Sequence, residues 1–267
     1  MPQEQLPVGI LLRDWRQRRR LSQLALAADA EISQRHLSFL ESGRSRPSRE
    51  MVLRLTEQLA VPLRDRNAIL LAAGFAPAYP HRPMVAPEFD AAREAIERLL
   101  QGHDPHPALA VNRHWMLLSA NKAVGILLSG VAGHLLVSEI NVLRLSLHPE
   151  GLAPRILNFR QWRDHVLARL AREIEVSADM QLAALFAELK AYPPPPQVSS
   201  SRGEQTAHGG IAVPLKLASD EGPLSFLSAT TIFGTAIDVT LSEVTIESFF
   251  PADPGTAKAM RRLAERV

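Results

Sequence analysis

The 267-residue sequence contains no cysteine, only 4 lysines and only 2 tyrosines. The absence of cysteine excludes disulfide bonds, thiolate metal sites, iron–sulfur clusters and a cysteine nucleophile. Because few side chains titrate between neutrality and pH 9, an isoelectric point near 9.3 accompanies a net charge of only +2. The high isoelectric point therefore does not by itself indicate a nucleic-acid-binding protein.

Long apolar runs are also missing. No run approaches the roughly 18 to 20 residues needed to cross a bilayer, and the first residues, MPQEQLPVG, lack the basic and apolar regions of a secretory signal. The content of 46% hydrophobic and 22% charged residues is typical of globular proteins. We therefore expect a cytoplasmic protein without membrane contact.

The charges are unevenly distributed along the chain. Residues 1–75 contain 12 arginines, no lysine and 8 acidic residues, a net charge of +4, whereas residues 76–267 have a net charge of −2. Between the two parts lies the proline-rich stretch APAYPHRPMVAP, residues 76–87, which is typical of a semi-rigid connector. These shifts predict a basic domain over 1–75, a linker over 76–87 and a second domain over 88–267.

Five short helices are expected between residues 9 and 73, with no strand among them. Ser22, Ser33 and Ser48 each precede an apolar-periodic segment and are suited to cap a helix N-terminus. Gly74 suits the end of the last helix, because glycine readily adopts the left-handed conformation found there. The first domain is therefore expected to be all-α.

The segment Leu21–Ser48 resembles the helix-turn-helix of the Cro/repressor-like (XRE) family of DNA-binding regulators. The similarity includes Gln23, the apolar positions from Leu26 to Leu40, and the exit Glu41-x-Gly43. It implies binding to double-stranded DNA, with Gln23 on a phosphate and with Arg44 and Arg46 as backbone clamps. The expected DNA-binding residues are Gln23, Ser33, Gln34, Arg35, Ser38, Phe39, Arg44 and Arg46.

Helical geometry agrees with this assignment. At 100° per residue, Leu37 and Leu40 point to one side of their helix, and Gln34 and Arg35 point to the other. Glutamine and arginine can read adenine and guanine in the major groove, although such residues on a helix surface are usually only solvated. Two alternatives stay open. Phe39 either contacts a thymine methyl or, as we prefer, packs under the loop 42–47, and residues 18–20 form either a phosphate-facing patch or a solvated face.

The second domain is expected to be α+β, with an antiparallel sheet. Helical patterns cover 89–101, 120–128, 158–174 and 179–191, and a final helix is capped by Asp253. A polar loop is expected over 193–210. Strand patterns cover the ranges 108–112, 114–119, 211–218, 224–233 and 244–250.

Catalytic signatures are not found, so we expect no enzymatic activity. The sequence has no G-x-S-x-G, P-loop, G-x-G-x-x-G or H-E-x-x-H motif. The strongest metal candidate is His103, Asp104 and His106 in the loop GHDPHP, but an exposed turn is the better interpretation because no fourth ligand is evident. Neither a metal nor a cofactor is therefore expected.

Residues 89–267 resemble the ligand-binding domain of MmyB-like transcription regulators, which pair an XRE helix-turn-helix with a PAS-like domain in this order. The similarity lies in NRHWMLLSANKAVGILL (112–128), NVLRLSLHPEGLAP (141–154), NFRQW from Asn158, and FGTAIDVTLSEVTIESFFPAD (233–253). It implies a five-stranded antiparallel sheet flanked by helices, around an apolar cavity that binds a fatty-acid-like molecule.

Residues that suit such a cavity lie between positions 115 and 162. Apolar residues would line its walls, Arg144 would bind a carboxylate, and three asparagines would donate hydrogen bonds. Alternatively, the apolar residues are plain core and the asparagines are turn or cap residues. The expected ligand-binding residues are Trp115, Leu117, Asn121, Asn141, Arg144, His148, Asn158 and Trp162.

Together these features predict a sequence-specific transcription regulator that acts as a homodimer. Two recognition helices would lie about 34 Å apart on a near-palindromic operator, and a fatty-acid-like effector would modulate DNA binding. The main alternative is a second domain that is a solid dimerisation or partner-binding module without a small ligand. An enzyme fused to a DNA-binding module is the third possibility.

Overall fold

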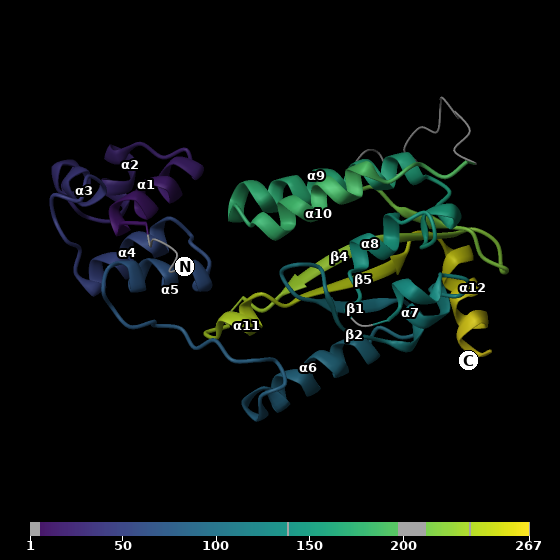
Figure 1. The fold of residues 1–267 in the computed structure, drawn as a ribbon. Coiled ribbons are helices and arrows are strands. Elements are labelled where there is room, and N and C mark those ends of the chain that lie inside the picture. The colour runs from purple at the N-terminus through teal and green to yellow at the C-terminus, as the bar shows by residue number, and fades with distance from the viewer. Residues whose placement is uncertain (1–5, 138, 197–211, 235, 267) are drawn as a thin grey trace. The chain divides into compact units, whose positions relative to one another are not determined.

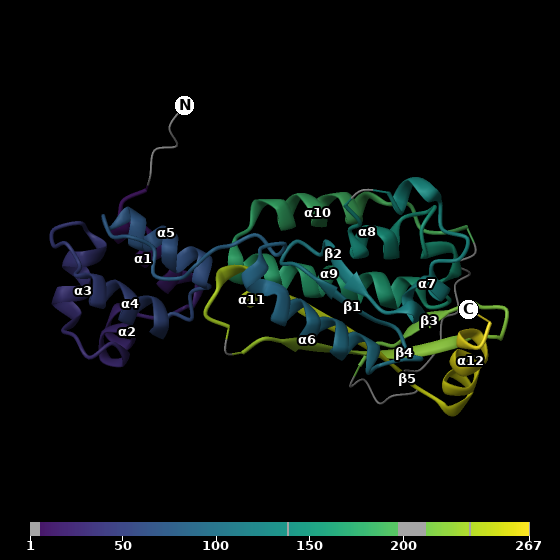
Figure 2. The same cartoon turned by 90° about the horizontal axis from the view of Figure 1, so that it is seen from below.

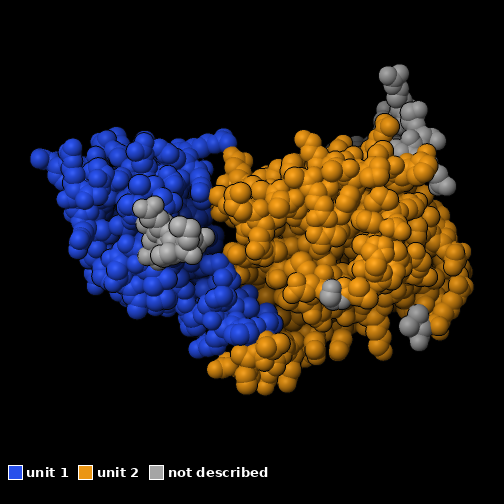
Figure 3. All heavy atoms as spheres, viewed as in Figure 1, with its two compact units in different colours: residues 1–84, 234–242 blue, residues 85–233, 243–267 orange. Residues whose placement is uncertain are grey.

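A computed structural model describes residues 6–137, 139–196, 212–234 and 236–266. The chain divides into two compact units, one of residues 1–84 and 234–242 and one of residues 85–233 and 243–267 (Figure 3). The expected polar loop 193–210 lies mostly outside the described residues.

The first unit contains the five expected helices: α1 (Val8–Arg18), α2 (Gln23–Asp29), α3 (Gln34–Glu41), α4 (Arg49–Gln58) and α5 (Leu63–Ala72) (Figure 1). The hydroxyls of Ser22, Ser33 and Ser48 each accept a hydrogen bond from the backbone N–H three residues further on, at 3.0 to 3.2 Å. These bonds satisfy N–H groups that a helix N-terminus otherwise leaves unpaired, so all three predicted caps are confirmed.

The first helix crosses the third at very short distance. A Cβ atom on Gly9 would lie 2.4 Å from the backbone oxygen of Leu40, so only glycine allows the two backbones to approach. Leu12 and Trp15 of α1 are buried in one core with Leu26, Leu37 and Leu40 of the next two helices. Burial of these residues defines which faces of α2 and α3 stay exposed.

The first unit also includes a segment from far along the chain. Residues 234–242, which end in the short helix α11 (Val239–Ser242), pack with the connector after α5. The backbone N–H of Val239 donates to the oxygen of Pro80 at 2.9 Å, and the buried Asp238 pairs with Arg82 at 3.5 Å. Nothing in the sequence pattern indicated this association.

The second unit contains the five-stranded antiparallel sheet that the resemblance implied, in the order β2-β1-β5-β4-β3. In β1, Ala108 pairs with Ser248 of β5, and in β4, Phe226 pairs with Pro251 of β5. The strands are β1 (Ala108–Val111), β2 (Leu117–Ala120), β3 (Leu215–Leu217), β4 (Leu224–Ile232) and β5 (Thr245–Pro251).

Helices cover both faces of this sheet. Helices α9 (Phe159–Ser177) and α10 (Met180–Ala191) lie side by side over one face, and α6 (Asp90–Gln101) lies on the other (Figures 1 and 2). The apolar stripe of α9 is buried against the sheet. The remaining helices are α7 (Lys122–Leu127), α8 (Val142–Leu147) and α12 (Pro254–Ala264), the last capped by Asp253 as expected.

Candidate DNA-binding surface and ligand cavity

Helices α2 and α3 form a helix-turn-helix whose inner face is buried in the core and whose outer face is polar. Leu26, Leu37 and Leu40 are fully buried, whereas Gln34 and Arg35 at the start of α3 are exposed. Ser38 is half-buried, and Ser33 is engaged as the cap of α3. The N-terminal turn of α3 therefore presents a glutamine and an arginine to an approaching duplex, as a recognition helix requires.

Phe39 organises two of the expected DNA-binding arginines. The guanidinium carbon of Arg35 lies 5.3 Å from the centre of the Phe39 ring, and that of Arg44 lies 5.9 Å from it. Both distances are in the range of cation–π contacts. Phe39 thus contacts Arg44 of the loop 42–47, in agreement with the preferred packing interpretation. Its ring also holds Arg35 and Arg44 on one surface. Arg46 is exposed nearby.

Gln23 is tied into an ion pair beneath the DNA-binding face. Its side-chain amide donates to Glu41 at 2.8 Å, and the two oxygens of Glu41 accept from Arg16 at 2.6 and 2.8 Å. Burial opposes ionisation of Glu41, but the hydrogen bonds from Arg16 and Gln23 outweigh it and lower the pKa of this carboxyl group. The side-chain amide of Gln23 is thus engaged within the protein, and its phosphate contact stays a prediction.

The run of arginines at the end of α1 is only partly available to DNA. Arg19 donates to the backbone oxygens of Leu59 and Ala60 at 2.8 and 2.9 Å and thereby closes the end of α4. Arg18 lies over the ring of Trp15 at 5.0 Å. Arg19 is thus a structural residue, because its guanidinium satisfies carbonyl groups that the helix end leaves unpaired.

A cavity of about 100 Å³ lies in the second unit between the sheet and helices α7, α8 and α9. Trp115, Leu117 and Trp162 line it, as expected for ligand-binding residues. Leucines on α7 and α8 provide much of the remaining wall. These apolar lining residues include Leu109, Val124, Leu127, Leu128, Val142, Leu143, Leu145, Leu152, Val166, Leu215 and Phe249.

The polar end of the cavity is formed by Arg169 of α9. Its two terminal nitrogens lie 2.6 and 3.2 Å from the carboxylate oxygens of Glu247 on β5, and its Nε donates to Glu173 at 3.3 Å. The guanidinium also lies over the ring of Trp115 at 4.5 Å, and the indole N–H of Trp115 donates to Glu173 at 2.8 Å. Burial opposes the charge of Arg169, but its bonds with Glu247 prevail and raise its pKa.

His165, one turn before Arg169, also lines the cavity. Its ring stacks on that of Trp162, with centroids 5.5 Å apart. Burial lowers the pKa of His165, and the positive charges of Arg169 and Arg172 lower it further. The imidazole is therefore neutral at pH 7 and can donate one hydrogen bond and accept another.

Five of the expected ligand-binding residues do not line this cavity. Arg144 forms a two-point ion pair with Glu188 of α10, at 2.6 and 2.8 Å, and His148 packs edge-on against Tyr192. The sequence analysis expected Arg144 to bind a ligand carboxylate, but its guanidinium binds the carboxylate of Glu188. The other three residues are Asn121, Asn141 and Asn158.

These three asparagines hold loops against strands and helices. The amide of Asn121 donates to the oxygens of Leu100 and His106, and Asn158 donates to that of Pro214. Asn141 caps α8, which is the cap role left open by the sequence. The hydrogen-bonding groups of each asparagine are thus engaged within the protein, mostly by backbone groups.

The loop with His103 and His106 is not a three-ligand site. His103 Nε2 lies 3.1 Å from the backbone oxygen of Phe249, and the ring centroids of His103 and His106 are 5.9 Å apart. Within the described ranges, the three-ligand group found consists instead of His134, His148 and Glu150. The sequence did not indicate this group, because its members come from two separate loops.

Arg169, Glu247 and His165 were missed as cavity residues. A signal was present, because Arg169 follows Val166 by three positions and so borders the apolar stripe of the helix. Glu247 occupies a position in β5 that alternation places on the same side as Phe249. A charged residue at each of two buried positions predicts a pair, but only the packing of α9 on the sheet brings them together.

No described helix combines the length and the apolar character that a membrane span needs. No curated protein matches the chain. Among solved structures, "Structure of an RNA-binding Light-Oxygen-Voltage Receptor" is similar at 14% identity over 97% of this chain, with a TM-score of 0.30. The chain spans 61% of the length of that protein.

Two family models match the chain. Residues 7–69 match a helix-turn-helix domain, and residues 92–263 match the MmyB-like transcription regulator ligand binding domain. These ranges coincide with the capped helices of the first unit and with the sheet, cavity and helices of the second. The chain therefore belongs to the MmyB-like ligand-binding-domain family and is a DNA-binding helix-turn-helix transcription regulator.

Proposed function

We propose that this regulator binds a small, fatty-acid-like molecule in the cavity of the second unit and that this effector modulates operator binding by a homodimer in the cytoplasm. The observation that carries the proposal is the cavity itself, which has mostly apolar walls, a polar end at Arg169, Glu247 and His165, and the serines Ser146 and Ser228. Such a distribution suits a ligand with one long apolar part and one hydrogen-bonding head group.

The size of the cavity limits the ligand. A volume of about 100 Å³ is below the roughly 300–1,000 Å³ of typical ligand pockets. A short chain fits this conformation, and a longer chain requires wall residues to move. Leu128 and Val142 are only half-buried, so they can be displaced at lower cost than the fully buried core.

The electrostatics of the polar end favour an uncharged head group. Arg169 carries one positive charge, and Glu247 and Glu173 already bond to it with two negative charges. A carboxylate would have to displace Glu247 or lie beside it, which is unfavourable at low dielectric constant. The favoured effector is therefore a protonated fatty acid or a similar chain with a hydroxyl or carbonyl group.

The chain offers a covalent route from the cavity to the DNA-binding unit. Ser228 on β4 and Glu247 and Phe249 on β5 line the cavity, and β4 and β5 are joined by the segment 234–242, which belongs to the helical unit. A ligand that shifts these strands acts on that segment through the backbone. To change DNA affinity, the ligand must bind two conformations of the protein with different affinities, and a tenfold difference in affinity corresponds to about 1.4 kcal/mol.

Mass spectrometry of an organic extract of the purified full chain tests the proposal. The wild type is expected to carry a co-purifying single-chain lipid or to take one up on incubation. Val166→Phe, which places a larger ring in the cavity wall, should abolish uptake. Leu118→Phe is the matched control, because Leu118 is 39% exposed and does not line the cavity.

Uptake by wild type and Leu118→Phe but not by Val166→Phe supports the sensor function. A clean extract together with no uptake by the wild type overturns it and supports the alternative of a dimerisation or partner-binding domain. Size-exclusion chromatography with light scattering tests the dimer separately.

A further inference from the structure

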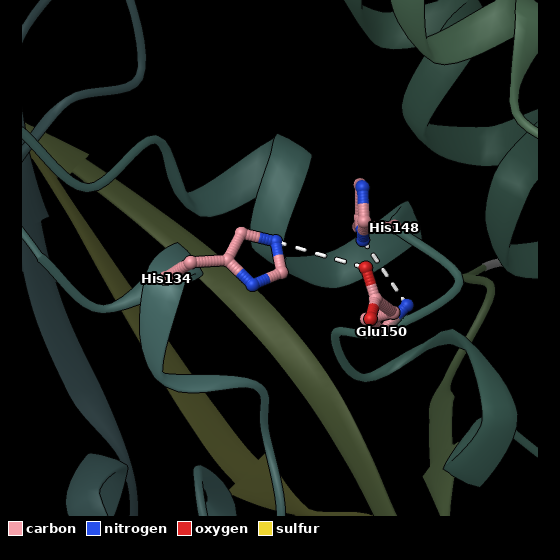
Figure 4. A group of neighbouring side chains, drawn as sticks. All are labelled: His134, His148 and Glu150. Carbon is pink, nitrogen blue, oxygen red and sulfur yellow. Dashed lines mark hydrogen bonds and ion pairs between the residues drawn. The ribbon is translucent and has the colours of Figure 1, made fainter.

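Two loops of the second unit bring three metal-binding side chains together. His134 lies in the short 3₁₀ helix η2 (Gly133–Leu135), His148 directly follows α8, and Glu150 lies in the next turn. One ligand atom from each lies within 4.8 Å of the other two. Figure 4 shows a carboxylate oxygen of Glu150 lying between the two imidazole rings.

The backbone holds these loops in place. The N–H of Ala132 donates to the oxygen of Glu150 at 3.0 Å, which ties the first loop to the second. The second loop is closed by a bond of 2.9 Å from the N–H of Leu152 to the oxygen of Leu145. Gly151 is required there, because a Cβ atom would lie 2.2 Å from the oxygen of Leu145. The group is therefore built on constrained turns.

The distance between His134 and Glu150 is close to that in a metal centre. His134 Nε2 lies 3.7 Å from Glu150 Oε2. Ligand atoms around a tetrahedral zinc ion, with bonds of about 2.0–2.1 Å, are separated by about 3.3 Å. The side chains of His134 and Glu150 are 57% and 64% exposed, so they can close the remaining gap without disturbing the core.

The Nδ1 lone pair of His148 faces Glu150. Its Nδ1 accepts a hydrogen bond from the N–H of Glu150 at 3.1 Å, which requires that nitrogen to be unprotonated. A cation can take this lone pair in place of the N–H. The ring also packs edge-on against Tyr192, with centroids 5.1 Å apart, which limits its rotation.

We propose that His134, His148 and Glu150 bind a divalent transition-metal ion, with zinc as the best-fitting case. Two imidazole nitrogens and one carboxylate oxygen suit Zn²⁺, Co²⁺ or Ni²⁺, whereas Mg²⁺ and Ca²⁺ prefer oxygen ligands throughout. Water completes the coordination, because the site faces solvent. The ion clamps the two loops that flank α8, and Leu143, Leu145 and Ser146 of that helix line the cavity.

Calorimetric titration with ZnCl₂ tests the site, on the full chain after chelator treatment and removal of any histidine tag. One saturable zinc ion per chain is expected, with a rise in melting temperature and with visible absorption when Co²⁺ replaces zinc. His134→Ala and Glu150→Gln should each weaken zinc binding at least tenfold. His81→Ala is the matched control, because His81 is an exposed histidine outside the group.

Retention of binding by His81→Ala and its loss in the two site variants establishes the site. No saturable binding by the wild type, or unchanged binding in both site variants, overturns the proposal. The titration requires no effector, so its failure is distinguishable from failure of the proposed lipid-binding function. Circular dichroism of each variant verifies that binding is lost from a folded chain.

Discussion

The guanidinium of Arg169 on α9 and the carboxylate of Glu247 on β5 form a two-point ion pair at the inner end of the cavity, with a shortest distance of 2.6 Å. The side chain of Glu247 is 5% exposed and that of Arg169 is 24% exposed. The pair thus joins the covering helix to the central part of the sheet at the polar end of a mostly apolar cavity.

Glu247→Gln is expected to destabilise the protein by about 2–4 kcal/mol, because it leaves Arg169 partly buried with a weaker partner. Urea unfolding followed by circular dichroism measures the change. Glu94→Gln is the matched control, because Glu94 and Arg98 form an exposed pair at 4.0 Å on α6 and should contribute little. Equal effects of the two substitutions would contradict the role given to the buried pair.

The head-group preference can be measured with two ligands of equal chain length. At pH 7.5 a fatty alcohol should bind at least as tightly as the matching fatty acid, because Glu247 and Glu173 already neutralise Arg169. Affinity for the acid should rise as the pH falls, since the protonated form is favoured, while affinity for the alcohol should change little. Fluorescence displacement provides both curves. Tenfold tighter binding of the acid at pH 7.5 would instead place a carboxylate on Arg169.

On DNA, Gln34→Ala and Arg35→Ala should relax sequence preference, each by about 1–3 kcal/mol at the base pair that it reads. Arg46→Ala should instead weaken specific and random DNA alike and make the dependence of log affinity on log salt shallower by about 1. Fluorescence anisotropy at several salt concentrations distinguishes the two classes. Equal losses on specific and random DNA for Arg35→Ala would show that it does not read bases.

Acid should weaken the first unit through Glu41. Its pKa is lower in the folded state than its ordinary value of 4.5, so the ionised form stabilises the fold above that value. This stabilisation is lost as the pH falls below 4.5 through the folded-state pKa. Glu41→Gln should therefore cost about 3 kcal/mol at pH 7, with a cost that shrinks as the pH falls below 4.5. A cost independent of pH would mean that the charge of Glu41 does not contribute.

The segment 234–242 should be needed for the response to effector but not for DNA binding itself. Asp238→Ala removes the ion pair with Arg82 and leaves α2 and α3 intact. Operator affinity without effector is expected to stay within about twofold of wild type, and the change caused by effector should fall towards none. Anisotropy titrations with and without a saturating lipid measure both. A full response in Asp238→Ala would show that this contact carries no coupling.

Much of the helix-turn-helix was predictable because its determinants are local. The serine caps at 22, 33 and 48 act on N–H groups three residues away, so sequence spacing alone located the helix starts. The periodicity of Leu37 and Leu40 likewise determined which face of α3 is exposed. The roles of Arg16 and Arg19 were not predictable, because Glu41 and the oxygen of Leu59 are distant in sequence.

For the cavity, too, local features could be predicted from the sequence and long-range contacts could not. Trp115, Leu117 and Trp162 were expected there from apolar patterning, which depends on local periodicity. Arg144 does not line the cavity, because the packing of α8 near α10 pairs it with Glu188. Asn121 and Asn158 were equally ambiguous, because an asparagine in a loop gives no sign of which backbone groups it will bind.

By itself, the sequence determined the charge and class of this regulator. Twelve arginines and no lysine in residues 1–75 give the DNA-binding domain a positive charge that should not fade at physiological pH, and the lack of cysteine excludes thiol-based sensing. The tertiary structure alone decided the pairing of Arg169 with Glu247, the approach of His134 to His148 and Glu150, and the place of residues 234–242 in the helical unit. Each joins residues from separate elements, and such contacts depend on how the elements pack rather than on the local propensities that sequence spacing reports.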